Sequence, residues 1–179
     1  MNNCKCFFID VDGVLTNGTK LYRDDGLPGA KKYYDKDFTG LKILRALGFD
    51  LVFVSGDDFV NKKMAENRKI KFISARNLDK AAVISDYLRQ NYPDLDVETF
   101  GIGDDIFDLS MLEMVDRAFC PSDSALAVKN LVVKKKRGII LNAKGGEGCI
   151  QEIAEMINPD KIDNELYEKI IALDALETF

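Results

Sequence analysis

Short apolar runs alternate along the chain with longer stretches in which apolar residues recur every three or four positions. The runs are typical of buried parallel strands, and the stretches are typical of amphipathic helices. We predict a first strand that begins near Cys6 and ends at Asp10, and further strands over residues 49–54, 71–73, 97–102 and 116–120. We predict helices over residues 37–47, 59–69, 78–92, 106–114, 149–157 and 160–176. Alternation of strand and helix indicates an α/β fold, a doubly wound, Rossmann-like parallel sheet with right-handed crossovers.

Several segments interrupt this alternation. Residues 17–34 contain two turn signals, Asn17-Gly18 and Asp25-Gly26, and predict a β-hairpin. Because the hairpin follows the first strand directly, we interpret it as a flap over the mouth of a site. The glycine-rich residues 144–148 predict a flexible stretch. Shorter features are a loop and helix start at 121–123 and brief apolar runs at 131–133 and 138–141.

The size of the chain suits one domain. With 179 residues, 46% of them apolar, we expect a single unit over residues 1–158 and a C-terminal helical extension over residues 159–179. The apolar runs are too short to span a membrane, and the N-terminus lacks the pattern of a signal peptide. We therefore expect a soluble, cytoplasmic protein.

Charge and residue types exclude several kinds of chemistry. A net charge of −5 argues against a nucleic-acid partner, and we interpret the basic run at 134–137 as a solvated face. The chain has no histidine, which removes Ser-His-Asp and Cys-His triads. Its four cysteines have no zinc-site spacing and are expected to be free thiols: Cys4, Cys6, Cys120 and Cys149.

Two carboxylates stand at the end of the first strand. Asp10 and Asp12 are followed by Gly13, at the edge of the sheet where α/β folds place their ligands. An acidic turn is the alternative interpretation of this tripeptide alone. Two such carboxylates repel each other unless a cation neutralises them, and oxygen ligands suit Mg²⁺. We therefore predict a magnesium site.

Three later stretches extend this pattern. Ser55-Gly56 follows the second core strand, Lys80 opens a helical stretch, and Gly103-Asp104-Asp105 with Asp108 follows another strand. In this order, the four stretches resemble the motifs of the haloacid dehalogenase superfamily of phosphatases. The chemistry would then use Asp10 as a nucleophile that forms an aspartyl phosphate and Asp12 as a general acid and base.

The remaining motif residues complete this expected site. Ser55 and Lys80 would bind phosphoryl oxygens together with Gly13 and Gly56. The resemblance implies that the metal is held by Asp10, by the backbone carbonyl of Asp12, and by Asp104. It also implies that Asp105 and Asp108 lie next to the metal site, but it does not indicate which of the two is nearer the metal. A lysine such as Lys80 is otherwise an ordinary surface residue.

The spacing leaves no room for a large cap domain between the first three motifs. The chain instead has a hairpin, a Lys-Asp element at residues 36–40 and a Gly-Gly-x-Gly tail. With these features it resembles capless members of the superfamily, the 3-deoxy-manno-octulosonate 8-phosphate phosphatases and their sialic acid 9-phosphate relatives. The resemblance implies an acidic sugar phosphate as substrate and a homotetramer with shared active sites. Lys62, Lys63 and Arg68 could offer charge to a sugar carboxylate.

The chain departs from the octulosonate enzymes in two places. Those enzymes commonly have Ser-Gly-Arg at the second motif, whereas this chain has Ser55-Gly56-Asp57. In the Lys-Asp element it has Phe38-Thr39 where a glycine is usual. A nonulosonate 9-phosphate is therefore the alternative substrate. Other classes left open are a non-catalytic partner domain of a sugar-activating cytidylyltransferase, a receiver domain, and a phosphomutase.

Overall fold

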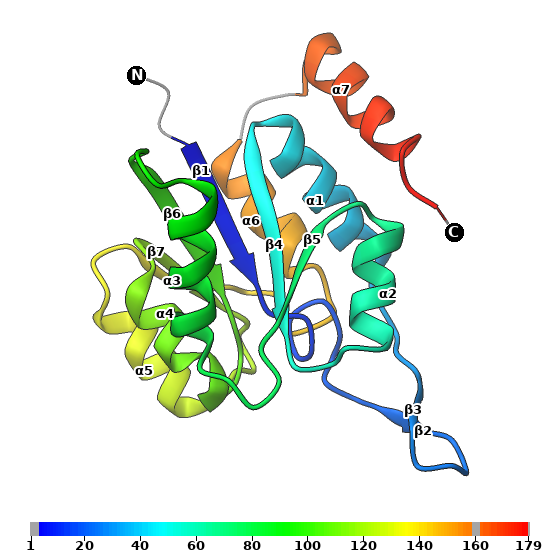
Figure 1. Ribbon diagram of the computed structural model, residues 1–179. Helices are drawn as coiled ribbons and strands as arrows, with labels where there is room; N and C mark the ends of the chain where they lie inside the picture. The colour runs from blue at the N-terminus through cyan, green and yellow to red at the C-terminus, as the bar shows by residue number, and fades with distance from the viewer. Residues whose placement is uncertain (1–3, 159–161, 179) are drawn as a thin grey trace.

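The predicted parallel sheet is present in the computed structural model, which describes residues 4–158 and 162–178. Six parallel strands lie in the order β5-β4-β1-β6-β7-β8 (Figure 1). Their bounds are β1 Cys4–Ile9, β4 Phe49–Ser55, β5 Lys71–Ser74, β6 Val97–Ile102, β7 Arg117–Cys120 and β8 Gly138–Ile140. The fold-class prediction is confirmed, and β8 falls on the apolar run at 138–141 that the sequence left without an element.

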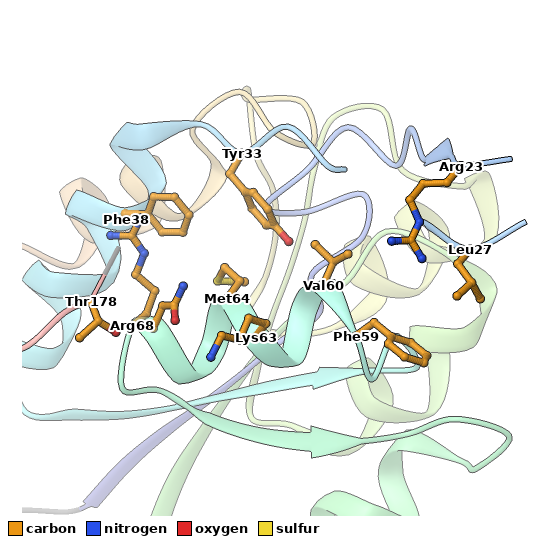
Figure 2. Close-up of a pocket in the computed structure, with 11 residues that line it drawn as sticks. Arg23, Leu27, Tyr33, Phe38, Phe59, Val60, Lys63, Met64, Arg68 and Thr178 are labelled. Atoms are coloured by element: carbon orange, nitrogen blue, oxygen red, sulfur yellow. The ribbon is translucent and has the colours of Figure 1, made fainter. Parts of the chain in front are cut away.

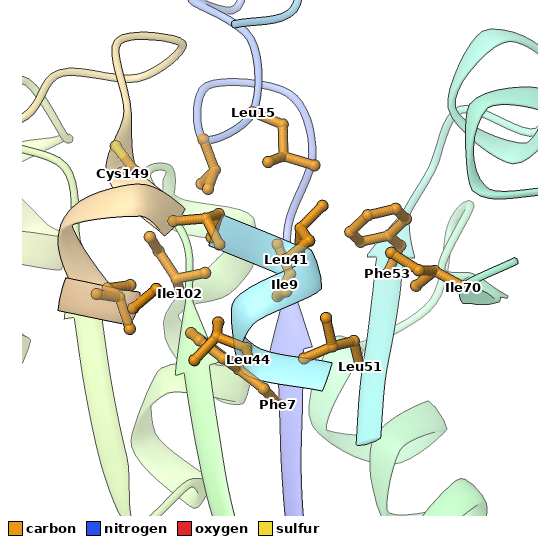
Figure 3. Packing of buried hydrophobic residues seen from close by; sticks show 14 of the residues in the cluster. Phe7, Ile9, Leu15, Leu41, Leu44, Leu51, Phe53, Ile70, Ile102 and Cys149 are labelled. Atoms are coloured by element: carbon orange, nitrogen blue, oxygen red, sulfur yellow. The ribbon is translucent and has the colours of Figure 1, made fainter. Parts of the chain in front are cut away.

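Helices cover both faces of this sheet (Figure 1). Alternate side chains of β1 point to opposite faces, as a pleated strand requires. Phe7 and Ile9 pack into a core with α1, α2, α6 and α7, whereas Cys6 and Phe8 pack into a second core with α3, α4 and α5. Figure 3 shows the first core, in which Leu41 and Leu44 of α1 lie over the strands. The helix bounds are α1 Asp35–Ala46, α2 Val60–Asn67, α3 Lys80–Asn91, α4 Leu109–Met114, α5 Leu126–Lys134, α6 Cys149–Ile157 and α7 Asn164–Asp174.

Most predicted helices are found within a few residues of their expected limits. The predicted helix at 106–114 begins as a 3₁₀ turn, Ile106–Asp108, before α4. Helix α5 was foreseen only as a helix start and an apolar run, because its exposed face carries apolar residues such as Leu126 and Val133. Helix α7 is shorter than the predicted 160–176; residues 160 and 161 of that prediction lie outside the described residues.

The predicted hairpin is also present. Strands β2, Leu21–Tyr22, and β3, Pro28–Ala30, pair antiparallel and project from the sheet edge (Figure 1). This hairpin is the only regular structure between β1 and α1, and α2 alone separates β4 from β5. Within these fully described intervals the chain therefore has no cap domain.

The glycine-rich loop differs from its prediction. We expected residues 144–148 to be flexible, but Gly146 N donates to Val14 O over 2.8 Å and Gly145 N donates to Asp123 Oδ1 over 3.0 Å. A Cβ on Gly145 would lie 2.1 Å from Gly13 O, so only glycine allows this approach of two backbones. The prediction of a flexible loop is wrong, because its glycines serve close packing rather than motion.

Helix α7 packs beside α1. Ile170 is buried in the first core, and Lys42 Nζ lies 2.6 Å from Asp174 Oδ1. The backbone N–H of Thr178 donates to Asn67 O over 2.9 Å. All four cysteines are free, as predicted; Cys4 is exposed and the other three are buried. In the described part of the chain, no helix combines the length and the apolar character needed to cross a membrane.

Candidate active site

The carboxyl ends of three neighbouring strands bring the sequence motifs together. Ile9 of β1 pairs with Phe53 of β4 on one side and with Ile102 of β6 on the other. Residues that follow these strands therefore meet at one edge of the sheet. A cavity of about 880 Å³ opens there, and its lining includes most of the predicted site: Asp10, Asp12, Ser55, Gly56, Lys80, Asp104, Asp105 and Asp108.

Lys80 is the central cation of this cavity. The carboxylate of Asp79 caps α3 by accepting from Ala82 N over 3.0 Å, which fixes the first residue of the helix. From there the buried Lys80 Nζ donates to Asp10 Oδ1 over 2.5 Å and to Asp108 Oδ1 over 2.6 Å. Burial acts to lower the pKa of Lys80, but the two carboxylates outweigh it and hold the pKa above its ordinary value.

Asp10, Asp104 and Asp108 form the one acidic cluster in the described residues whose carboxylate oxygens, one from each residue, lie within 4.8 Å of one another. The sequence did not rank Asp105 against Asp108, and the structure separates them. The Asp108 carboxylate is buried and accepts from the backbone N–H groups of Asp104 and Asp105 at 2.9 and 3.1 Å. Asp105 is exposed, and its side chain caps the 3₁₀ turn. Asp108 therefore lies in the cluster, and Asp105 lies outside it.

This cluster fits a divalent cation. Burial and the neighbouring carboxylates raise the pKa of Asp10 to about 8, and the same two causes raise the pKa of Asp104 to about 7. A bound cation would favour the ionised carboxylates and offset their mutual repulsion and the cost of burying their charge. Gly13, at a φ of +90°, permits the approach, because a Cβ at this position would lie 2.1 Å from Asp104 Oδ2. Oxygen ligands of this kind suit Mg²⁺.

The side chain of Asp12 points to a different group of residues. Lys31 Nζ donates to Asp12 Oδ2 over 2.9 Å, and Asn61 Nδ2 donates to the same oxygen over 3.1 Å. The amide of Asn61 also donates to Ser55 Oγ over 2.9 Å, and Lys31 forms an ion pair with Asp57. The sequence analysis missed Lys31 and Asn61, because a lysine after a hairpin and an asparagine in a basic helix carry no motif signal.

The three basic residues proposed for the sugar carboxylate do not line this cavity. Lys63 and Arg68 line a second cavity of about 580 Å³ between the hairpin, α1 and α2 (Figure 2). The Arg68 guanidinium lies 3.7 Å from the centre of the Phe38 ring and forms an ion pair with Glu177. Lys62 is exposed on α2. The cations that line the first cavity, among the described residues, are Lys20, Arg76 and Lys80.

Comparison with known proteins finds a relative that is a sugar-phosphate phosphatase. The chain is 29% identical over 158 residues to the 3-deoxy-D-manno-octulosonate 8-phosphate phosphatase of Haemophilus influenzae, a match that covers 88% of this chain and 84% of the relative. A scan against models of protein families finds no match.

Comparison with solved structures also finds phosphatases of this kind. The cobalt-bound phosphatase of Haemophilus influenzae has a TM-score of 0.75 and 29% identity, with 87% of each chain covered. The Moraxella catarrhalis phosphatase, in complex with magnesium, phosphate and the sugar acid, has a TM-score of 0.71 and 23% identity, covering 96% of this chain and 90% of that one. A Streptomyces avermitilis protein described as a haloacid dehalogenase family hydrolase has a TM-score of 0.75 and 19% identity, with coverage of 92% and 88%. The chain thus has the fold of the haloacid dehalogenase hydrolases, and in sequence and structure it resembles their 3-deoxy-D-manno-octulosonate 8-phosphate phosphatases.

Proposed function

We propose that this chain is a Mg²⁺-dependent phosphatase that hydrolyses an acidic sugar phosphate. The favoured candidate substrate is 3-deoxy-D-manno-octulosonate 8-phosphate. The observation that carries the proposal is the buried contact of Lys80 with both Asp10 and Asp108 at the carboxyl end of β1. Such a cation beside a carboxylate cluster can stabilise the negative charge of a transferring phosphoryl group.

The reaction divides into two displacements. A carboxylate oxygen of Asp10 attacks phosphorus, the bond from phosphorus to the sugar oxygen breaks, and the Asp12 carboxyl group gives its proton to that oxygen. Water then attacks the aspartyl phosphate while Asp12 takes a proton from it, and the bond from phosphorus to the Asp10 oxygen breaks. The products are the free sugar, inorganic phosphate and an unchanged enzyme.

The metal would be held by Asp10, Asp104 and Asp108, with the backbone carbonyl of Asp12 as a further ligand expected from the family resemblance. When bound, Mg²⁺ supplies positive charge that neutralises the carboxylates and the phosphoryl oxygens. Ser55 and the backbone of Gly13 and Gly56 serve as hydrogen-bonding partners of those oxygens, and Lys80 contributes a fixed charge.

The alternative substrate is a nonulosonate 9-phosphate. Asp57 leaves this alternative open, because the residue stands where the octulosonate enzymes commonly carry arginine, and here it is buried and paired with Lys31. A non-catalytic partner domain is less well supported, because all five principal motif residues are present: Asp10, Asp12, Ser55, Lys80 and Asp104.

The experiment is a phosphate-release assay on the two sugar acids and on neutral hexose phosphates, each with Mg²⁺ and with a chelator. We expect release only with Mg²⁺ and a catalytic efficiency at least ~10-fold higher for one of the acids, because a carboxylate contact contributes on the order of 1.4 kcal/mol or more. Equal efficiencies would contradict the substrate class. No release from any compound, including a generic aryl phosphate, would contradict the activity itself.

A further inference from the structure

Lys31 is a buried cation that the reaction outlined above does not use. It directly follows β3, at the base of the hairpin, yet its side chain is 0% exposed. Its Nζ lies 2.8 Å from Asp12 Oδ1, donates to Asp12 Oδ2 over 2.9 Å and to Asn61 Oδ1 over 2.9 Å, and contacts Asp57. A buried lysine needs such partners to remain charged, and here they come from two segments of the chain, the loop after β1 and residues 57–61.

Asn61 supplies the second half of this arrangement. It is fully buried, and its Oδ1 accepts from Lys31 and, over 3.1 Å, from Tyr33 Oη. Its Nδ2 donates to Asp12 and to Ser55. All the hydrogen-bonding capacity of the amide is used in one orientation only, so Asn61 can point its N–H groups in no other direction.

The Asp12 carboxyl group is therefore held from two sides. Lys31 Nζ and Asn61 Nδ2 both donate to Oδ2, and the same Nζ lies in ion-pair distance of the buried Oδ1, which has no other partner among the described residues. The exposed Lys20 lies farther from the same carboxylate, with its Nζ 3.5 Å from Asp12 Oδ2, and the Lys80 ammonium binds Asp10 and Asp108 instead. Misplacement of a reacting group by about 1 Å can cost ~10²-fold in rate.

We propose that Lys31 and Asn61 are positioning residues that hold the Asp12 carboxyl group in the orientation for proton transfer to the leaving oxygen. This inference rests on the proposed phosphatase function and names a role that the motif residues do not fill. Because Lys31 also ends the hairpin, the same contact fixes the base of the hairpin to the reacting group.

The test uses the dependence of rate on the leaving group. A 4-nitrophenolate ion leaves without a proton, whereas the alkoxide of a sugar or simple alkyl phosphate needs one, and general acid catalysis contributes ~10²–10⁴-fold to such steps. We expect Lys31→Met to lower kcat/KM at least ~10-fold more for an alkyl phosphate than for 4-nitrophenyl phosphate, with KM changed less than ~3-fold. Asn61→Leu should shift the same ratio in the same direction.

Controls separate this role from a structural one. Lys32→Met, at the exposed neighbouring lysine, should leave both rates at the wild-type level. Since Lys31→Met leaves Asp57 without its cation, the double variant Lys31→Met with Asp57→Asn restores the charge balance and carries the test if the single variant does not fold. Equal losses on both substrates in the folded variants would overturn the positioning role while leaving the phosphatase function in place. A wild-type protein that hydrolyses neither substrate would overturn the proposed function, and the positioning role with it.

Discussion

Lys80 and Asp10 lie 70 positions apart in the chain, yet Lys80 Nζ and Asp10 Oδ1 are 2.5 Å apart in the interior of the site. The contact joins the end of β1 to the start of α3 and leaves both side chains less than a tenth exposed. Each of these buried charges is stabilised by the other, so removal of either side chain leaves its partner with less compensation for its charge.

Replacement of the nucleophile should separate activity from folding. Asp10→Asn keeps the shape of the side chain but removes the attacking oxygen, so we expect phosphate release to fall at least ~10³-fold. Because Lys80 keeps the Asp108 carboxylate as its charged partner, a neutral amide at position 10 should change Tm by less than ~4 °C. Release from an aryl phosphate and a thermal melt followed by circular dichroism measure the two effects. A variant with more than a small fraction of wild-type activity would show that another group attacks phosphorus.

Asp108 and Asp105 form a matched pair for the metal site. Asp108→Asn should raise the half-saturating Mg²⁺ concentration at least ~10-fold, because the residue belongs to the carboxylate cluster. Asp105→Asn, at the exposed cap of the 3₁₀ turn, should raise it less than ~3-fold. The rise of Tm with added Mg²⁺ gives a second measurement that does not depend on turnover. If the two variants shift equally, Asp108 is not a ligand.

Asp37 caps the helix that follows the glycine-rich loop. Its buried carboxylate accepts from Ile150 N at 2.7 Å and from Gly148 N and Gln151 N at 3.3 Å. Asp37→Ala leaves these donors without a partner, and we expect a loss of about 1–3 kcal/mol in the free energy of unfolding in urea. Asp35→Ala, an exposed carboxylate in the same helical turn, is the control and should cost less than ~0.5 kcal/mol.

The ion pair of Asp57 with Lys31 should make stability depend on pH in the acid range. Burial acts to raise the pKa of Asp57, but Lys31 and the N–H groups of Phe59 and Val60 outweigh it and hold the pKa below its ordinary value. The unfolded state therefore binds the proton first, and the stabilisation, complete above a pH of about 4, is lost as pH falls further. Thermal melts between pH 7 and 3 should show a steeper acid decline for the wild type than for Asp57→Asn. Parallel curves would mean that the pair adds nothing to the free energy of unfolding.

Assembly can be tested at the hairpin. Leu21 and Tyr22 are 62% and 65% exposed, and a two-stranded hairpin buries too little surface to be stable alone. We expect a homotetramer in which these residues pack against a neighbour, with a mass about four times 20.1 kDa by light scattering after size exclusion. The double variant Leu21→Ser with Tyr22→Ser should dissociate, whereas Leu95→Ser, an equally exposed leucine outside the hairpin, should not. An active wild-type monomer would remove the proposal of shared sites.

The arrangement of the motif residues could be predicted because it follows from the backbone alone. Once Ile9, Phe53 and Ile102 are assigned to parallel strands, the polar residues after them must share an edge. The choice between Asp105 and Asp108 could not be made, since it depends on whether the chain makes a 3₁₀ turn or an α-helical turn at Ile106. The sequence pattern does not resolve that difference.

Two other features lay outside what a linear pattern can show. The burial of Lys31 depends on α2 arriving beside the hairpin, a contact between segments 30 positions apart. The glycines at 145 and 146 were interpreted as freedom of motion, because glycine is the residue both of mobile loops and of close backbone contact. Only the position of Gly13 beneath Gly145 distinguishes the two roles.

The central place of β1 in the sheet has a consequence for how the protein folds. Among the six strands of the sheet β1 comes earliest in the chain, but its two neighbours are β4 and β6, whose pairing positions begin at Phe49 and Val97. Contacts between such distant segments form slowly, because a long loop must close before they contribute. During synthesis the apolar strand from Cys6 to Ile9 has no partner on its β6 side until about residue 102 has emerged. We therefore expect a refolding rate set by the docking of β6, and nascent chains that end before it to be prone to aggregation.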